Sequence, residues 1–391
     1  MTSALGTRSE ALLATADGEV FRGRSAGVEG VTTGEAVFNT SMTGYQEILT
    51  DPSYAGQVVA MTASHIGNYG TTPQDDQSGS PAVSGFVMRA MSRRESNWRA
   101  EGSLAAYLHD NGVVAISDID TRRLTRHLRD RGAMPVAVGS GVSEEELKEI
   151  AANAPVMDGQ DLASTVTTSE AYRLPATAEH RGLVVAIDLG VKRDILDNLT
   201  SRGFDVEVVP ASTTANAILE LAPAGIFVSN GPGDPEPLTE TARTLQDLIG
   251  KSPMFGICLG HQVLGLALGA STYKLPFGHH GGNHPVRRMS DGRVDITAQN
   301  HGFAVDLWSL TSDTPPERSG LVTPDLLPSS VDTRFGELRP THQNLNDGTI
   351  EGMALTDVPA YSVQYHPEAA PGPSDANSLF DRFAQLIEVG S

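Results

Sequence analysis

The sequence contains one cysteine, Cys258, and its surroundings are those of a nucleophile. It lies in a G-x-C-x-G motif at 256–260, between an apolar run at 253–257 and a predicted helix at 259–268. A tight, strained turn from strand to helix requires small residues on both sides of the nucleophile. The N-terminus of the helix favours the thiolate, and the N–H of Leu259 can point at a developing oxyanion. A buried, inert cysteine is the ordinary alternative, but the glycine-flanked turn favours a nucleophile.

A histidine and a glutamate near the C-terminus have the spacing of a base and the group that orients it. Residues 361–365 are predicted to form a strand, and Pro367 ends it, so that His366 and Glu368 follow at its end. Side chains at i and i+2 share a face of an extended segment, which allows the carboxylate to hold the imidazole. Alone, His-Pro-Glu is more often a turn than a site. The interpretation as a site is favoured here because the same chain contains the cysteine turn.

A glycine-rich loop follows another predicted strand, at 225–230. Gly231 and Gly233 belong to Gly-Pro-Gly-Asp-Pro, which is also the composition of an ordinary turn. As a functional loop, its glycines would let backbone N–H groups approach a substrate closely. It lies at the carboxyl end of its strand, where open α/β sheets bind ligands.

The elements around these residues predict an α/β protein of two domains. From residue 182 onward, buried apolar strands alternate with helices, which indicates a largely parallel sheet flanked by helices. The strands are expected at 183–187, 204–209, 225–229 and 253–257, and the helices at 191–202, 238–249 and 259–268.

The N-terminal part is expected to be a mixed α/β domain over residues 1–175, followed by a linker at 176–181 and the second domain at 182–391. A hairpin is predicted from 11–15 and 19–21, with further strands at 57–61 and 85–88. Helices are predicted at 103–109 and 120–131, and a third begins with the capping pattern of Ser143 and Glu146. The Pro-, Ser- and Thr-rich segment 313–339 is predicted to be a surface loop.

Composition excludes several classes of function. The 391 residues contain 28 Lys and Arg against 48 Asp and Glu, for a net charge of −20. A chain with this much negative charge repels nucleic acid and anionic lipid. Neither is therefore expected as a partner. One cysteine excludes an internal disulfide and a cysteine-rich zinc site. The first ten residues lack a secretory pattern and no apolar run is long enough for a membrane span, so we expect a cytoplasmic protein.

Together, the cysteine turn, the glycine loop and the His-Pro-Glu end resemble the class I, or triad-type, glutamine amidotransferases. The block NTSMTGYQEILTDPSY at 39–54 further resembles the N-terminal domain of the small-subunit family of carbamoyl-phosphate synthases. Other amidotransferases of the class lack this block. Shorter segments that also resemble this family lie at 65–68, 118–122, 277–285, 300–303 and 371–373. Segment 313–339 departs from the family pattern, which has a shorter connection there.

The resemblance implies a glutaminase whose triad is Cys258, His366 and Glu368. The implied product is ammonia for a large ATP-dependent subunit that makes carbamoyl phosphate from bicarbonate, for pyrimidine and arginine biosynthesis. No cofactor is expected in this chain, with ATP and Mg²⁺ on the large subunit. The implied pocket for L-glutamine consists of Ser53, contributed by the N-terminal domain, with Gly231, Gly233, Leu259, Gln262, Asn300, Gly302 and Phe303.

Three alternatives to this interpretation exist. The chain could be the glutaminase of another synthetase, which the 39–54 block argues against, or a silent regulatory subunit, which the intact triad argues against. His279, His280, His284 and Asp291 could suggest a metal site. Their spacing fits no standard ligand set, so no metal is expected.

Overall fold

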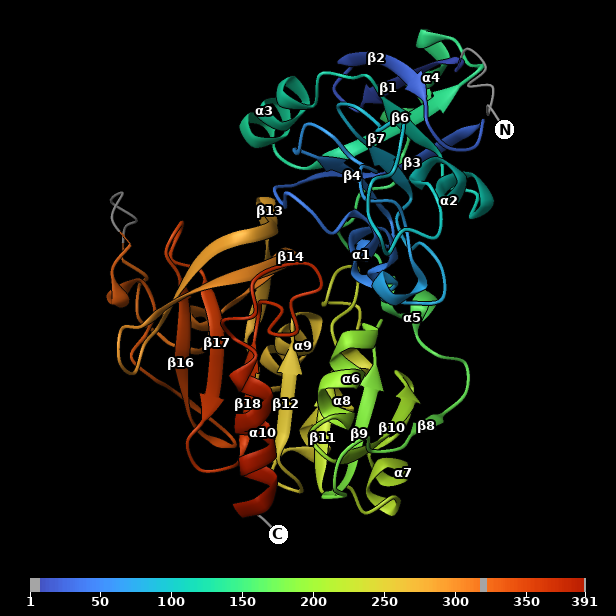
Figure 1. The fold of residues 1–391 in the computed structure, drawn as a ribbon. Helices are drawn as coiled ribbons and strands as arrows, with labels where there is room; N and C mark the ends of the chain where they lie inside the picture. The colour runs from blue at the N-terminus through green and yellow to red at the C-terminus, as the bar shows by residue number, and fades with distance from the viewer. Residues whose placement is uncertain (1–7, 317–321, 390–391) are drawn as a thin grey trace. The chain divides into compact units, whose positions relative to one another are not determined.

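The computed structural model describes residues 8–316 and 322–389, which fall into two compact units (Figure 1). The first unit comprises Met1–Asp158 and Pro276–His280, and the second comprises Gly159–Leu275 and Gly281–Ser391. Residues 1–7, on which part of the expectation about a leader rests, and 317–321 of the expected loop lie outside the described residues. Within the described ranges, none of the helices has the length and apolar character needed to span a membrane.

A closed barrel of seven strands forms the first unit. Around the barrel the order is β1-β2-β6-β5-β4-β3-β7. The strands are β1 (Glu10–Thr15), β2 (Val20–Ser25), β3 (Val31–Asn39), β4 (Gln57–Met61), β5 (Gly85–Val87), β6 (Ala115–Ser117) and β7 (Met134–Ser140). The predicted first hairpin is confirmed, since β1 pairs antiparallel with β2. Closure depends on β7 pairing with both β1 and β3, which no local pattern in the sequence specifies.

The helices described in the first unit include three that begin within one residue of the predicted start and one, over 45–50, that was not predicted. They are α1 (Tyr45–Thr50), α2 (Leu104–Asp110), α3 (Thr121–Arg131) and α4 (Glu144–Ala152). Three of them have a side-chain oxygen that accepts from a backbone N–H of the first turn. Ser103 accepts from Ala106 N at 3.2 Å, Asp120 from Arg123 N at 2.9 Å, and Ser143 from Glu146 N at 3.2 Å.

The second unit is built on a large mixed sheet whose centre is parallel. The parallel strands run in the order β10-β9-β11-β12-β18. They are β9 (Gly182–Asp188), β10 (Phe204–Pro210), β11 (Gly225–Val228), β12 (Met254–Ile257) and β18 (Ala360–Val363). These strands confirm the buried runs predicted from the sequence. Because β9 lies between β10 and β11, the order reverses there, and ligands bind at the carboxyl edge beside such a reversal.

Antiparallel strands extend this sheet on both sides, which makes it less parallel than expected. One edge carries β8 (Tyr172–Leu174), paired with β10. Beyond β18 lie β17 (Ile350–Leu355), β16 (Gly336–Asn344), β13 (Ser271–Arg288) and β14 (Val294–Asp306), with β15 (Val331–Thr333) paired to β16.

Helices cover both faces of the parallel strands (Figure 1). The helices are α6 (Arg193–Thr200), α7 (Ala215–Glu220), α8 (Thr239–Leu248), α9 (Leu259–Ala267) and α10 (Ser378–Val389), with a short α5 (Ala163–Val166) before β8. Val184 and Ala186 pack with α6 and α10, whereas Val185 and Ile187 pack with α7, α8 and α9. This alternation buries β9 on both sides, which explains its unbroken apolar sequence.

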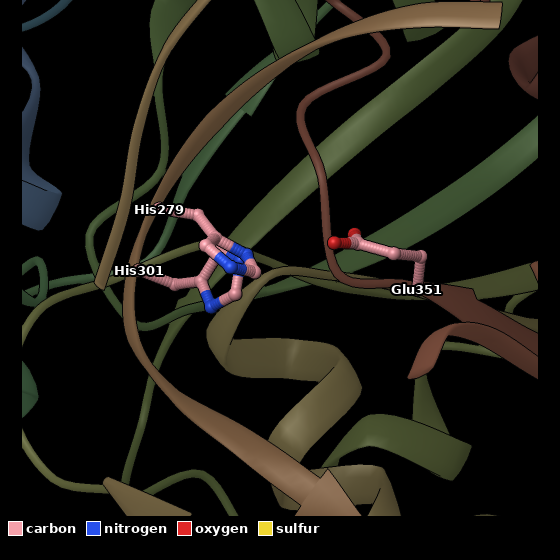
Figure 2. Close-up of side chains that lie close together, drawn as sticks. All are labelled: His279, His301 and Glu351. Carbon is pink, nitrogen blue, oxygen red and sulfur yellow. The ribbon is translucent and has the colours of Figure 1, made fainter. Parts of the chain in front are cut away.

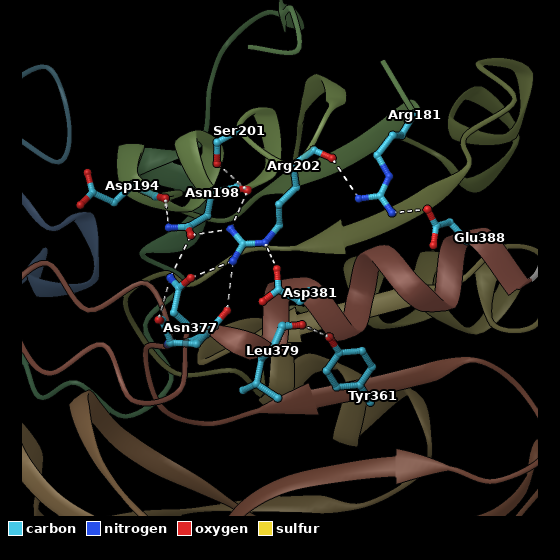
Figure 3. Close-up of polar contacts among 11 residues, drawn as sticks. Arg181, Asp194, Asn198, Ser201, Arg202, Tyr361, Asn377, Leu379, Asp381 and Glu388 are labelled. Atoms are coloured by element: carbon cyan, nitrogen blue, oxygen red, sulfur yellow. Dashed lines mark hydrogen bonds and ion pairs between the residues drawn. The ribbon is translucent and has the colours of Figure 1, made fainter. Parts of the chain in front are cut away.

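Polar contacts join α6 to α10 beside this apolar layer (Figure 3). Arg202 donates from Nε to Asp381 Oδ1 at 2.7 Å, and from its terminal nitrogens to Asn198 Oδ1 at 2.9 Å and Asn377 Oδ1 at 2.8 Å. Asn377 also donates to the carbonyl of Pro367 at 3.5 Å. The C-terminal helix is thereby linked to the segment that contains His366 and Glu368.

The two units divide between Asp158 and Gly159, earlier than the predicted linker at 176–181. Residues 159–175, which fall within the predicted N-terminal domain, bond to the second unit. Gly159 N donates to Asp234 Oδ2 at 2.8 Å, and Thr168 N donates to Asp188 Oδ2 at 2.7 Å. A short, largely exposed edge strand such as β8 has no apolar periodicity, so its sequence resembles a linker.

The prediction of a surface loop over 313–339 is wrong for its second half. Val331 and Leu338 are both buried and face each other across the β15–β16 pair. Trp308 further donates from its indole to the carbonyl of Leu326 at 3.0 Å. The abundance of Pro, Ser and Thr conceals two short strands whose few apolar residues are buried.

Candidate active site

Cys258 occupies the predicted turn between β12 and α9. Its φ of 53° and ψ of −107° are unusual for a side chain with a Cβ. The flanking glycines leave no room for larger residues, because a Cβ on Gly256 would lie 2.9 Å from Gly260 O and one on Gly260 would lie 2.3 Å from Val228 O. The sulfur is buried and lies 3.4 Å from the carbonyl of Asn300. The strand–turn–helix geometry expected for this motif is therefore present.

His366 and Glu368 follow β18 and contact each other as their spacing predicts. The imidazole Nδ1 donates to Glu368 Oε1 at 2.6 Å. The backbone N–H of His366 donates to Ala298 O at 2.9 Å, which ties this segment to β14. Among the described residues, no acceptor meets hydrogen-bond geometry at His366 Nε2, although Cys258 interacts with the ring and raises its pKa. Glu368 therefore fixes the tautomer, and Nε2 is the nitrogen that can transfer a proton.

Sequence reasoning missed a buried lysine in this cluster. Lys192, which lies between β9 and α6, places Nζ 2.9 Å from Glu368 Oε1 and donates to Ala369 O at 2.7 Å. The side chains of Lys192 and Glu368 are 2% and 0% exposed, so the ion pair is shielded from solvent. The sequence gives one sign of Lys192: it is a basic residue that follows closely after a buried strand, at the carboxyl edge of the predicted sheet.

The charges in this cluster are set by their neighbours rather than by burial. Burial alone raises the pKa of Glu368, but the charges of Lys192 and His366 outweigh it and lower the pKa to about 2. Burial alone lowers the pKa of His366, but Glu368 and Cys258 outweigh it and raise the pKa to about 10. At neutral pH the cluster therefore contains a carboxylate and an imidazolium, which can donate a proton from Nε2.

The Gly-Pro-Gly-Asp-Pro loop lies at the carboxyl end of β11. A Cβ on Gly231 would lie 2.0 Å from Leu189 O, and one on Gly233, whose φ is 90°, would lie 2.7 Å from Gln160 O. Backbone packing within the second unit therefore requires both glycines. Their predicted approach to a substrate stays a prediction.

Most of the predicted pocket residues lie around the cysteine turn. The missing side chain of Gly231 leaves room for Leu259, whose Cδ2 would be 2.8 Å from a Cβ there. Gln262, on the first turns of α9, donates from Nε2 to the carbonyl of Phe303 at 2.8 Å. Asn300 contributes its carbonyl to the cysteine sulfur, and a Cβ on Gly302 would meet no atom within 4 Å.

Ser53 belongs to the first unit. It lies in the short helix η1 (Pro52–Tyr54), is buried, and its backbone N–H donates to Asp51 Oδ1 at 2.9 Å. Its role in a glutamine pocket stays a prediction.

Sequence reasoning also missed a row of hydrogen-bonded, buried polar side chains that ends at the carbonyl of Phe303. His301 on β14 and Glu351 on β17 point toward each other (Figure 2). Gln299 joins them, accepting from His301 Nε2 at 2.9 Å and donating to Glu351 Oε2 at 2.9 Å. The two residues are far apart in the sequence and their strands are not neighbours in the sheet, so no spacing in the sequence predicts the contact.

The residues weighed as a metal site are divided between the units. His279 and His280 belong to the first unit, and His284 and Asp291 to the second. Asp291 is held by Arg288, with contacts of 2.9 and 2.6 Å, and Thr297 donates to the carbonyl of His284 at 3.0 Å. The expectation of no metal stays a prediction.

This arrangement has the parts needed for acyl transfer from an amide. A thiol at a helix N-terminus can attack a carbonyl carbon, and nearby backbone N–H groups can stabilise the oxyanion. A charged imidazole, held by a carboxylate, can protonate the departing amine.

Two family models and many curated proteins match this chain. Residues 13–138 match the model "Carbamoyl-phosphate synthase small chain, CPSase domain", and residues 185–386 match "Glutamine amidotransferase class-I". A carbamoyl phosphate synthase small chain from Syntrophotalea carbinolica is 50% identical, over 97% of this chain and 98% of that protein. Small chains from Akkermansia muciniphila and Xanthomonas campestris are each 48% identical, covering 96% and 97% of this chain and 97% and 99% of their own lengths. The chain therefore belongs to the carbamoyl-phosphate synthase small-chain family.

Proposed function

We propose that this chain is the glutamine-hydrolysing subunit of a carbamoyl-phosphate synthase and supplies ammonia to a large synthetase subunit. The observation that carries the proposal is the triad-like cluster of Cys258, His366 and Glu368 at the carboxyl edge of the parallel sheet. It lies in the part that matches the amidotransferase model, whereas residues 13–138 match a model specific to the small chain. The second match disfavours a glutaminase that serves another synthetase.

The first half-reaction forms a thioester. The thiolate of Cys258 attacks the side-chain amide carbon of glutamine, and the N–H groups of Leu259 and Gly231 stabilise the oxyanion. His366 then donates its Nε2 proton to the amide nitrogen as the C–N bond breaks. Ammonia leaves, and the glutamyl group stays on sulfur. The raised pKa of His366 supports this step, because it keeps the proton available in the resting enzyme.

Hydrolysis of the thioester restores the enzyme. Neutral His366 takes a proton from water as the oxygen attacks the thioester carbon, and the C–S bond breaks to release glutamate. The imidazolium and the thiolate are regenerated together. The ion pair of Lys192 with Glu368 holds the carboxylate that orients His366 throughout the cycle.

The ammonia is used elsewhere. We propose that a large subunit, which binds ATP and Mg²⁺, receives it and forms carbamoyl phosphate from bicarbonate. We propose further that the complex works in the cytoplasm and feeds pyrimidine and arginine biosynthesis. No cofactor in this chain is needed for the glutaminase steps.

Co-purification with a large partner tests the proposal. The complex is expected to form carbamoyl phosphate from glutamine, bicarbonate and ATP, with one glutamate released for each product molecule. Anthranilate, guanylate or another amidated product in place of carbamoyl phosphate would refute the assignment to this synthetase. Absence of glutamine hydrolysis by a well-formed complex would instead favour a regulatory subunit.

A further inference from the structure

A buried carboxylate on β17 has no role in the triad. Glu351 is 0% exposed and is approached by a donor on each oxygen. Asn344 Nδ2 donates to Oε1 at 2.7 Å, and Gln299 Nε2 donates to Oε2 at 2.9 Å. Both oxygens of this buried side chain are thus satisfied by amide donors, as buried acceptor oxygens require. A buried negative charge requires a compensating positive charge nearby.

His301 is a nearby histidine of the same unit that can supply this positive charge. Its Nδ1 faces the carbonyl of Phe303 at 2.8 Å, and its Nε2 faces Gln299 Oε1 at 2.9 Å. Both partners are acceptors when Gln299 directs its amide nitrogen toward Glu351, so both ring nitrogens carry a proton. A ring nitrogen of His301 and a carboxylate oxygen of Glu351 lie within 4.8 Å of each other. The amide of Gln299 thus joins His301 to Glu351, with its oxygen toward the ring and its nitrogen toward the carboxylate.

The other end of this row of hydrogen-bonded side chains reaches residues of the predicted glutamine pocket. The carbonyl of Phe303 accepts from His301 Nδ1 and also from Gln262 Nε2, each at 2.8 Å. The same short segment of β14 contributes the carbonyl of Asn300 to the sulfur of Cys258. The conformation of this segment therefore depends on the charge of His301, which in turn depends on Glu351.

We propose that Glu351 is a positioning residue of the glutaminase site, which acts through Gln299 to keep His301 protonated and the segment 300–303 in its binding conformation. This inference rests on the proposed hydrolysis of glutamine. Glu351 acts on the segment 300–303 through Gln299 and His301, so its removal affects binding of glutamine more than the chemical step.

Glu351→Gln tests the inference because it removes the charge and nearly preserves the shape. The new amide donates toward Gln299, whose amide turns over and donates to His301 Nε2, leaving a neutral ring. We expect the KM for glutamine to rise roughly three- to tenfold, the range of a weakened charge-assisted hydrogen bond, with kcat within about twofold. The matched control is Glu337→Gln on β16, whose partly exposed carboxylate pairs with Arg339 at 2.9 Å. Its KM is expected to match that of the wild type.

A second measurement reads the charge of His301 without any substrate. In ¹⁵N spectra of the full chain at pH 8, the two ring nitrogens of an imidazolium resonate close together, whereas those of a neutral imidazole lie far apart. The signals are assigned by their loss in a His301→Gln variant. An imidazolium in the wild type and a neutral ring in Glu351→Gln are expected.

The two measurements separate the possible failures. A neutral His301 in the wild type, or an unchanged KM in Glu351→Gln, would overturn the inference. If the wild type does not hydrolyse glutamine, the proposed function fails, and the spectrum still decides the charge of His301. If Glu351→Gln does not fold, the wild-type spectrum alone decides. A neutral His301 overturns the inference, and an imidazolium supports it.

Discussion

At the scale of single residues, the proposed function depends on a few buried charged and reactive groups. Cys258, His366 and Glu368 could be predicted as a set because each lies in a local motif with its own physical reason. Lys192 could not, because its ion pair with Glu368 joins residues far apart in the sequence. The same holds for His301 and Glu351, which meet only after β14 and β17 enter one sheet. Local spacing therefore identifies the groups proposed to react and misses the buried charges beside them.

The buried pair of Lys192 and Glu368 gives the first prediction. Removing one partner leaves the other charge buried and less compensated, which costs about 3–5 kcal/mol. Lys192→Met and Glu368→Gln should each lower the melting temperature of the protein clearly in calorimetry. The double variant should lose less than the sum of the two.

The exposed pair of Arg339 and Glu337 is the matched control for this cycle. Arg339→Met, Glu337→Gln and their double variant should change the melting temperature little, because solvent screens the pair. Strict additivity of the Lys192 and Glu368 variants would contradict a coupled buried pair.

The dependence of stability on pH gives the second prediction. The lowered pKa of Glu368 adds stability above the unfolded value of about 4.3, and this stability is lost as the pH falls toward about 2. The raised pKa of His366 adds stability that is complete below the unfolded value of about 6.5 and is lost as the pH rises toward about 10. The contribution of Glu368 and His366 to the free energy of unfolding is therefore greatest at a pH between these two unfolded-state pKa values.

Melting curves of the wild type and the Lys192→Met/Glu368→Gln variant measure this dependence. The difference in melting temperature should be largest near pH 6 and should shrink toward pH 9, because the wild type loses the stability that Glu368 gives through His366. A difference that stays constant or grows over this range would show that Glu368 does not raise the pKa of His366.

At the scale of secondary structure, the sheet brings the active-site loops together at one edge. The loops that follow β9, β11, β12 and β18 contribute Lys192, the glycine loop, Cys258 and His366. The sequence was sufficient to predict these strands because each is a short, continuous apolar run. It was insufficient for β8 and β15, which are short strands at an edge, and for the start of β16, where only Leu338 is buried among the first four residues.

The tight turn at Cys258 gives the third prediction. Gly260→Ala would place a Cβ 2.3 Å from the carbonyl of Val228, so β11 or α9 must shift. We expect a loss of stability of about 1–3 kcal/mol, together with loss of glutamine hydrolysis because the cysteine moves. Thermal unfolding and a glutaminase assay measure the two effects.

Gly79→Ala is the control, since a Cβ there meets no atom within 4 Å. It should leave both the melting temperature and the activity unchanged. Full activity in Gly260→Ala would contradict the requirement for a glycine beside the nucleophile.

At the scale of the whole molecule, two units match two different family models, and the proposed function needs both. The amidotransferase model accounts for hydrolysis of glutamine, and the small-chain model accounts for the choice of synthetase. Two domains were predictable from the length and from the change of pattern near residue 182. The boundary between Asp158 and Gly159 was not, because 159–175 bond to the second unit through isolated backbone and side-chain contacts. Similarly, a barrel closed by β7 depends on long-range pairing that leaves no local signal.

The most direct test of the central claim is a comparison of two nitrogen sources in the Cys258→Ser variant, assembled with the large subunit. Carbamoyl phosphate is measured with glutamine and, separately, with ammonium salt. The account predicts that glutamine-dependent synthesis is abolished while ammonia-dependent synthesis stays at the wild-type rate, since only the thioester step is lost. Glutamine-dependent synthesis that survives, or loss of both activities, would contradict a nucleophilic role for Cys258.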